Sequence, residues 1–163
     1  MSFSATRRGL FAAGAAIITS SVAGCLGSSR TSTAINEPLA VSNAHQYSSP
    51  GCACCGQYAS YLRDHLDTEL SETVPQDVSA TKRRHGIPAE LQSCHTIVLD
   101  EYVVEGHIPV EVIATVLNEQ PEIGGIALPG MPAGSPGMGG TKRGAFTIYA
   151  VGGGRTGDVY TEF

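Results

Sequence analysis

Four cysteines are the residues of this chain best suited to chemistry. Cys52, Cys54 and Cys55 fall within one short run, and Cys94 follows much later in the chain. Adjacent cysteines such as Cys54 and Cys55 form a disulfide only with strain, because disulfide geometry requires well-separated α-carbons. Densely placed thiolates bind soft metals such as Cu(I), and they also carry out thiol–disulfide exchange. The four cysteines therefore predict a soft-metal site or a redox site.

Residue types and spacing alone leave several interpretations of these cysteines open. Two structural disulfides would have three alternative connectivities, but the crowding at residues 52–55 is unfavourable for them. A Cys₄ zinc site usually takes its ligands from two Cys-x₂₋₄-Cys pairs, and the second pair is missing here. Copper(I) accepts low coordination numbers and bridging thiolates, so four sulfurs suit one ion or a small multinuclear cluster. The spacing favours copper(I) over zinc.

A thiol–disulfide oxidoreductase is the alternative function for the same residues. Cys52 and Cys55 have the Cys-x-x-Cys spacing of redox enzymes, with Cys54 inserted between them. In that scheme the exposed thiol nearest the helix start is the nucleophile and another thiol, such as Cys94, resolves the mixed disulfide. Such an enzyme could also cycle copper between Cu(I) and Cu(II). The additional thiols favour metal binding over catalysis.

Three further residues are candidates for the metal site, and a fourth, His107, has two alternative roles. His95 follows Cys94 directly, and we expect it to orient or protonate a thiol. Met131 and Met138 lie in a glycine- and proline-rich segment, where a thioether is either a soft Cu(I) ligand or an adaptable apolar contact. His107 has two interpretations of equal weight, a contact at the start of a helix and a residue that lines the site.

The expected elements place the first cysteines between a strand and a helix. Residues 39–47 predict a strand, and apolar residues at helical spacing from Tyr58 to Leu66 predict a helix that opens at the cysteines. A helix N-terminus carries the positive end of the helix dipole, which favours a thiolate. A strand, a cysteine motif and a helix in this order are typical of a thioredoxin-like α/β fold.

The rest of the chain predicts a central mixed sheet flanked by helices. Asp77 is expected to cap a helix over residues 78–85 that Gly86 ends, and Lys82-Arg83-Arg84 is expected on its solvated face. Residues 121–144 are so rich in glycine and proline that we expect a long loop there and no regular element. Pro109 is expected to open another helix. Further strands are expected over residues 68–74, 96–99, 102–105, 146–151 and 158–163.

The first 24 residues predict a twin-arginine lipoprotein signal peptide. Arg7-Arg8 precedes a short apolar run, and Val22-Ala23-Gly24-Cys25 resembles a lipobox. Cys25 would then be lipidated, residues 25–38 would form a flexible tether, and residues 39–163 would form the metal-binding domain. This predicts an extracytoplasmic protein that a lipid anchor holds on the outer face of the cell membrane. A plain signal peptide with an incidental cysteine is the alternative.

The charge balance narrows the class of partner. The whole chain has a net charge of -5, and loss of residues 1–24 leaves 8 Lys+Arg against 15 Asp+Glu, a net charge of -7. This acidity argues against nucleic acid and against a polybasic membrane patch. A chain of this length is expected to form one domain with a modest core.

Five motifs occur in order along the chain: Cys52-Ala53-Cys54-Cys55-Gly56, Gly86-Ile87-Pro88 and residues 91–96, 102–109 and 129–138. Together they resemble the CopG-type copper-resistance proteins. The resemblance covers roughly residues 47–163 and implies a thioredoxin-like fold, copper binding by the four cysteines and a role in copper and heavy-metal resistance. A metal ion is then the expected ligand. The resemblance implies no protein partner and no copper source, and a copper transporter or chaperone is a separate expectation for a copper-binding protein. Members usually have glycine between the first two cysteines, where this chain has Ala53.

Overall fold

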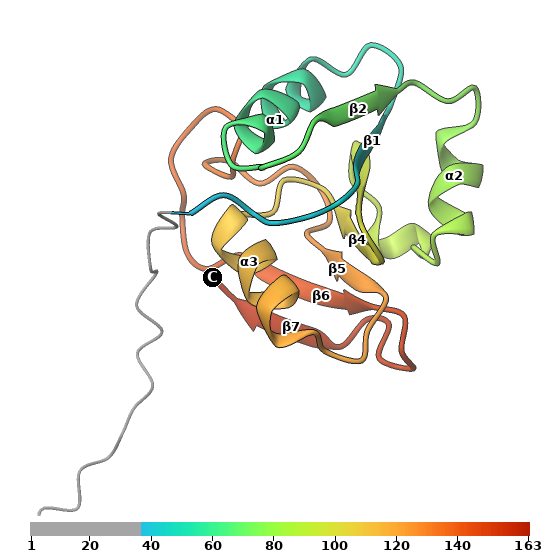
Figure 1. Cartoon of the computed structure of the whole chain (residues 1–163), viewed down its shortest axis with the longest axis vertical. Helices are drawn as coiled ribbons and strands as arrows, with labels where there is room; N and C mark the ends of the chain where they lie inside the picture. Colours follow the sequence, from blue (N-terminus) through green and yellow to red (C-terminus); the bar gives the residue numbers. More distant parts are fainter. Residues whose placement is uncertain (1–36) are drawn as a thin grey trace, which may run out of the picture. The chain divides into compact units, whose positions relative to one another are not determined.

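A seven-stranded sheet organises residues 37–163, the part of the chain that the computed structural model describes (Figure 1). The expected signal peptide, Cys25 and most of the tether lie outside these residues. The strands are β1 (Ala44–Ser48), β2 (Leu70–Thr73), β3 (His95–Leu99), β4 (Tyr102–Glu105), β5 (Gly125–Ala127), β6 (Thr147–Val151) and β7 (Val159–Glu162). The helices are α1 (Ala53–Arg63), α2 (Val78–Arg84) and α3 (Val110–Glu119), with a 3₁₀ turn at Ala89–Leu91.

The sheet is mixed, and its order is β2-β1-β3-β4-β5-β6-β7. β1 runs parallel to β2 and β4 runs parallel to β5, while the other neighbours are antiparallel. The parallel pairs follow from the crossovers, since α1 connects β1 to β2 and α3 connects β4 to β5. The expected α/β class with a mixed sheet and flanking helices is confirmed.

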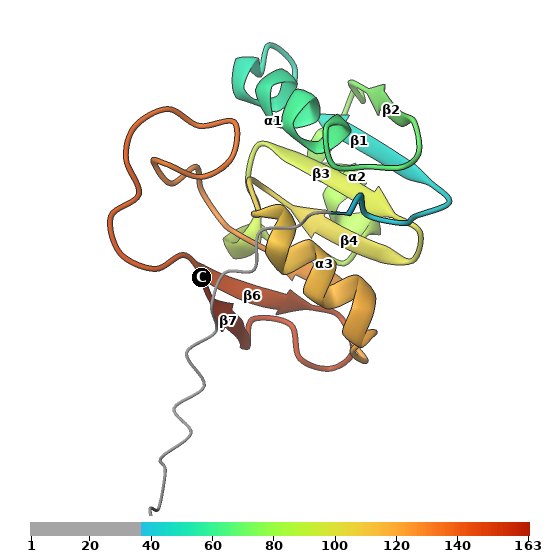
Figure 2. The ribbon, with the colours of Figure 1, turned by 60° about the vertical axis from the view of Figure 1, so that its left-hand side comes forward.

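Helices cover both faces of this sheet. Figure 2 shows α1 and α3 on one face and α2 on the other. The larger core lies under α1 and α3, where Leu62 and Ile113 are fully buried with Ile97 of β3. A smaller core that includes Ile87 and Val103 belongs to the α2 side. Successive residues of β3 therefore point alternately toward α1 and toward α2.

Local signals placed three helix boundaries correctly. The Asp77 carboxylate accepts a hydrogen bond from the Ala80 backbone at 2.8 Å, and Gly86 follows the helix with φ +73°. α1 starts at Ala53, and the Cys52 sulfur caps it by accepting a hydrogen bond from the Cys55 backbone at 3.2 Å. Side-chain acceptors satisfy N–H groups that the first turn leaves without helical partners.

Three expectations were wrong. β5 forms at Gly125–Ala127, although we expected no regular element in residues 121–144. A Cβ at Gly125 would overlap the Val103 carbonyl, so this glycine permits close strand approach instead of marking a loop. Lys82 is only 2% exposed, not on a solvated face, because Glu105 pairs with it. β1 starts at Ala44 instead of residue 39.

No helix within residues 37–163 has both the length and the apolar character needed to cross a membrane.

Candidate metal centre

Four cysteine sulfurs gather where the N-terminus of α1 meets the start of β3. The sulfurs of Cys52, Cys54, Cys55 and Cys94 all lie within 4.8 Å of one another. Cys54 Sγ is central, at 3.5 Å from Cys52 Sγ and 3.6 Å from Cys94 Sγ. Ser49 brings the two segments together, because its backbone N–H and its hydroxyl both donate to the Cys94 carbonyl, at 3.1 and 2.7 Å.

The redox state of this group is mixed. Cys52 and Cys55 form a disulfide, while Cys54 and Cys94 are free thiols. Two structural disulfides are therefore not formed among these four residues. Cys55 is 1% exposed and Cys52 is half-buried, so Cys52 is the accessible end of the disulfide.

A second group of ligand atoms shares the Cys94 sulfur. His95 Nδ1 lies 3.3 Å from Cys94 Sγ, and His107 Nε2 lies 3.1 Å from it. The other ring nitrogens face backbone carbonyls, with His95 Nε2 at 3.1 Å from Gly106 O and His107 Nδ1 at 2.7 Å from Pro136 O. A carbonyl only accepts, so these nitrogens carry the ring proton in the neutral imidazoles. The lone pairs of both rings therefore point at one sulfur.

Burial keeps both imidazoles neutral. Burial lowers the pKa of His95 to about 3, with smaller contributions from the charges of His107 and Lys82. Burial also lowers the pKa of His107. Burial, followed by the neighbouring Cys54, raises the pKa of the Cys94 thiol to about 12. At neutral pH one thiol proton thus faces two lone pairs, and a soft cation that displaced this proton would find a sulfur and two imidazole nitrogens.

The ring of Tyr58 packs against both histidine rings. This side chain is fully buried, and its ring centroid lies 4.6 Å from that of His95 and 5.3 Å from that of His107. Its hydroxyl donates to Ile108 O at 2.7 Å. The packing and the hydrogen bond hold the ring in one position, so the imidazoles above it are held as well.

Residues 128–146, which contain no helix or strand, pass over the site. Met131 Sδ lies 3.9 Å from Cys54 Sγ, and Pro136 supplies the carbonyl that orients His107. A Cβ at Gly137 would lie 2.7 Å from the Tyr58 nitrogen, so this glycine lets the segment approach α1 closely. Met138 makes no comparable sulfur contact within the described residues. The structure therefore brings one of the two candidate methionines to the cysteines.

Ala53 is compatible with the local backbone. It is the first residue of α1, and the non-glycine residues with positive φ in the described part of the chain are Asp100 and Gln120. An alanine in helical conformation carries no left-handed strain. The glycine expected at this position is therefore not required here.

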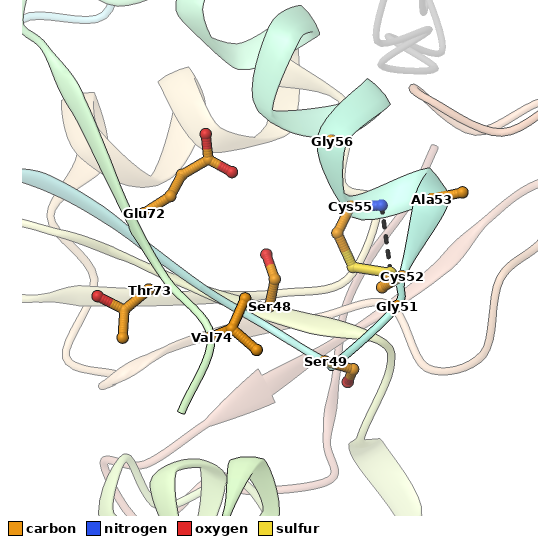
Figure 3. A pocket seen from close by; sticks show the side chains of 10 residues that line it. All are labelled: Ser48, Ser49, Gly51, Cys52, Ala53, Cys55, Gly56, Glu72, Thr73 and Val74. Atoms are coloured by element: carbon orange, nitrogen blue, oxygen red, sulfur yellow. Dashed lines mark hydrogen bonds between the residues drawn. A yellow bond between two sulfur atoms is a disulfide. The ribbon is translucent and has the colours of Figure 1, made fainter. Parts of the chain in front are cut away.

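A cavity of about 380 Å³ adjoins the disulfide. Figure 3 shows Cys52, Cys55 and Gly56 on one side of it and Glu72, Thr73 and Val74 at the end of β2 on the other. The remaining lining residues are Ser48, Ser49, Gly51 and Ala53. This cavity gives a solute access to the half-buried Cys52.

The structure decides one question that the sequence left open. His107 lines the site, as one of its two interpretations predicted. It follows Cys94 by 13 positions, which is not a recognised ligand spacing, so the sequence did not reveal it. The backbone carbonyls of Gly106 and Pro136 that orient the imidazoles carry no sequence signal at all. The four cysteines, His95 and Met131 lie together, whereas Met138 does not join them.

Comparisons with known proteins found one matching family and two similar solved structures. Residues 91–138 match a family described as a protein of unknown function, DUF411. Two solved structures of a copper resistance protein CopG, form 1 and form 2, are each 34% identical to this chain, with a TM-score of 0.66. They cover 78% of this chain, which in turn covers 98% and 99% of theirs. Among curated proteins, no relative matches.

Proposed function

The chain belongs to the CopG copper resistance family, and from this membership together with its N-terminal motifs we propose that it is an exported, lipid-anchored copper(I)-binding protein that acts in copper or heavy-metal homeostasis or resistance. Its cysteine cluster is able to bind a metal. The copper resistance named for its relatives supports copper as that metal. Cys52, Cys54, Cys55 and Cys94 are the proposed thiolate ligands, with His95, His107 and Met131 as neighbouring donors.

The observation that carries this proposal is the convergence of soft donors on Cys94. Its sulfur belongs both to the four-cysteine group and to the group with His95 and His107. Thiolate, thioether and imidazole donors suit Cu(I), whereas carboxylate ligands for hard cations are not part of either group. Two ligand groups that share one sulfur are compatible with one ion or a small multinuclear cluster. Zinc is the weaker candidate, because Met131 adds a thioether next to Cys54.

Full thiolate binding requires reduction of the disulfide. With Cys52 and Cys55 joined, Cys54 and Cys94 remain as thiols. A dithiol reductant, itself oxidised to a disulfide, supplies the two electrons and two protons that break the S–S bond and restore four thiols. Each thiol loses a proton when it binds Cu(I). The reduced protein is therefore the form expected to bind the most copper.

Anaerobic titration of the reduced full-length protein with Cu(I), in competition with a chromogenic chelator, tests the proposal. We expect tight uptake by the wild type and little uptake by a variant with serine at all four cysteines. Zinc, titrated in parallel, should bind more weakly. Equal Cu(I) uptake by the wild type and the four-serine variant would rule the proposal out.

A thiol–disulfide or copper oxidoreductase is the second candidate, favoured by the disulfide beside the cavity. Its support includes a thioredoxin-like assignment, based on the order β2-β1-β3-β4 and on a helix that starts at the cysteines after β1. In this mechanism Cys52, Cys55 and Cys94 are catalytic. Reduction of a protein disulfide substrate with multiple turnovers would favour the enzyme, whereas stoichiometric reduction alone would favour the copper-binding function.

The proposed location is the outer face of the cell membrane. Its support is the arginine pair, the apolar run and the lipobox-like residues that end at Cys25. A copper transporter or chaperone is the proposed protein partner, since bound copper must be delivered or removed. Release of a Cys25→Ser variant from membranes, with unchanged metal content, is the expected result. A wild-type protein that is soluble and cleaved elsewhere would rule out the anchor.

A further inference from the structure

A ring of buried polar side chains lies behind the metal centre, on the α2 side of the sheet. Lys82 Nζ lies 2.5 Å from Glu105 Oε1 and donates to Thr96 Oγ1 at 3.1 Å. The Thr96 hydroxyl donates in turn to Glu105 Oε2 at 2.6 Å. Lys82 is 2% exposed and Glu105 is not exposed. We call these three residues the charged ring.

Stability alone does not account for the charged ring. Removing two charges from water costs several kcal/mol per ion, and apolar replacement of a buried pair is often neutral or stabilising. Burial raises the pKa of Glu105, and the Lys82 charge and the hydrogen bonds to the carboxylate offset only part of that rise. An arrangement of this cost is more readily explained if it has a second role, such as fixing the conformation of its neighbours.

One arm of the charged ring reaches the residue before Cys94. Glu105 Oε1 accepts a hydrogen bond from the Ser93 backbone N–H at 2.5 Å. The Ser93 hydroxyl donates to the Gly130 carbonyl, next to Met131. The Glu105 carboxylate therefore fixes the start of β3 and, through Ser93, the segment that carries Met131.

A second arm reaches His107 along the backbone. Glu105 is followed by Gly106, which donates to the His95 carbonyl at 3.1 Å and accepts from the His95 ring at 3.1 Å. Gly106 has φ +82°, and a Cβ there would lie 2.8 Å from Ser93 Cβ. Because the chain is this tightly packed, a displaced Glu105 would move the segments before Cys94 and before His107 together.

We propose that the charged ring is a positioning device for the metal centre: Glu105, held by Lys82 and Thr96, sets the Cys94 sulfur and the two imidazole lone pairs at their common point. The expected effect on copper affinity rests on the proposed copper(I) function. The contacts from which this proposal is argued do not depend on bound copper. Glu105 and Lys82 touch no ligand atom of the site, so they act through Ser93 and Gly106.

Two double variants separate positioning from charge. K82M/E105Q removes both charges but keeps a side-chain oxygen that accepts from Ser93 N–H, while K82M/E105L removes the charges and the acceptor. R155M/D158N removes an exposed ion pair in the turn between β6 and β7, outside the site and its cavity, and is the matched surface control. The full-length proteins are reduced and kept anaerobic. The measurements are the NMR shifts of the His95 and His107 rings without metal, and the Cu(I) affinity in competition with a chelator.

We expect K82M/E105Q and the surface control to keep the wild-type ring shifts and to bind Cu(I) within about threefold of the wild type. K82M/E105L should shift both rings and lose about tenfold or more in Cu(I) affinity, the range typical of lost support around a metal ligand. Wild-type behaviour of K82M/E105L would overturn the proposal. Equal losses in both double variants would also overturn it, because charge and not the acceptor would then be responsible.

Two further outcomes remain decisive. If K82M/E105L does not fold, K82M/T96V/E105L removes the whole ring and takes its place, and unfolding of that variant as well would overturn a positioning role in favour of a purely structural one. If the wild type binds no Cu(I), the proposed function fails. The ring shifts of the metal-free proteins then still decide whether the charged ring positions His95 and His107.

Discussion

Two buried polar clusters lie on opposite faces of the sheet beside β3 and β4. They differ in whether each polar atom has its own hydrogen-bond partner. In the charged ring, Lys82, Thr96 and Glu105 satisfy one another. In the metal centre, the lone pairs of His95 and His107 converge on the single Cys94 thiol. His95 and Thr96 are neighbours in sequence but face opposite sides of the sheet.

This difference separates positioning from binding. A buried polar group with a complete set of partners has no capacity left for a ligand, and it stabilises one conformation of the chain. In the other cluster a sulfur and two imidazole nitrogens share one thiol proton. When that proton leaves, their lone pairs are available to bind a soft cation. The charged ring should therefore govern folding and geometry, whereas the metal centre should govern copper affinity.

The largest expected effect is on folding, from breaking the charged ring on one side only. Lys82→Met leaves the Glu105 carboxylate buried without its cation, so we expect the free energy of unfolding to fall by about 3–5 kcal/mol. Denaturant unfolding of the reduced protein measures this loss. Adding Glu105→Gln should recover most of it, since the remaining side chains are neutral. A loss below 1 kcal/mol in the single variant, about the size of an exposed pair, would contradict the comparison.

Acid should destabilise the protein through the metal centre. In the unfolded chain His95 binds a proton below about pH 6.5, whereas in the folded protein its pKa is about 3. The unfolded state therefore binds more protons between these values, and stability falls as the pH falls through this window, by about 3 kcal/mol from pH 7 to pH 4.

His95→Gln is the control for this acid effect. Its amide can still donate to the Gly106 carbonyl but does not titrate. Subtracting its unfolding free energy from that of the wild type at each pH isolates the contribution of His95 from that of Glu105, whose raised pKa acts in the opposite direction. Parallel pH profiles for the two proteins would show that His95 is not held neutral.

Cys94→Ser should affect copper more than folding. Its sulfur belongs to both ligand groups, so we expect Cu(I) affinity to fall by about 100-fold or more, about 2.7 kcal/mol, since losing a ligand exceeds the cost of losing its support. Chelator competition measures the affinity, and thermal unfolding should change little. Cys25→Ser is the control that should bind normally. Undiminished affinity of Cys94→Ser would separate copper binding from this site.

The smallest expected effect distinguishes the two methionines. Met131→Leu keeps the apolar bulk but removes the thioether 3.9 Å from Cys54, so most Cu(I) should stay bound while its transfer to a chelator changes by about two- to fivefold. Met138→Leu is the matched control and should behave as the wild type. Equal effects of both substitutions on the stopped-flow transfer rate would argue for a general property of the loop.

The fold was predictable where neighbours in sequence decide the structure. Asp77 caps its helix, Gly86 ends it, and the hairpin of β3 and β4 lies over the residues expected for it. β5 was missed because Gly125 lies in a glycine- and proline-rich segment, which is typical of a loop. The need for glycine there arises from the close approach of Val103 on β4, a residue distant in sequence. The signal peptide and Cys25 remain predictions, because they lie outside residues 37–163.

The sequence by itself determined which residues are chemically suited to soft-metal binding and where the helix that presents three of them begins, since thiol type, spacing and capping are local properties. Only the tertiary structure decided that Cys94 meets those cysteines, that His107 faces its sulfur and that Lys82 is buried against Glu105. These contacts join residues between 13 and 42 positions apart, and no periodic pattern encodes such pairs. They form because the sheet and its helices bury apolar surface, and that burial brings distant polar groups to the same place.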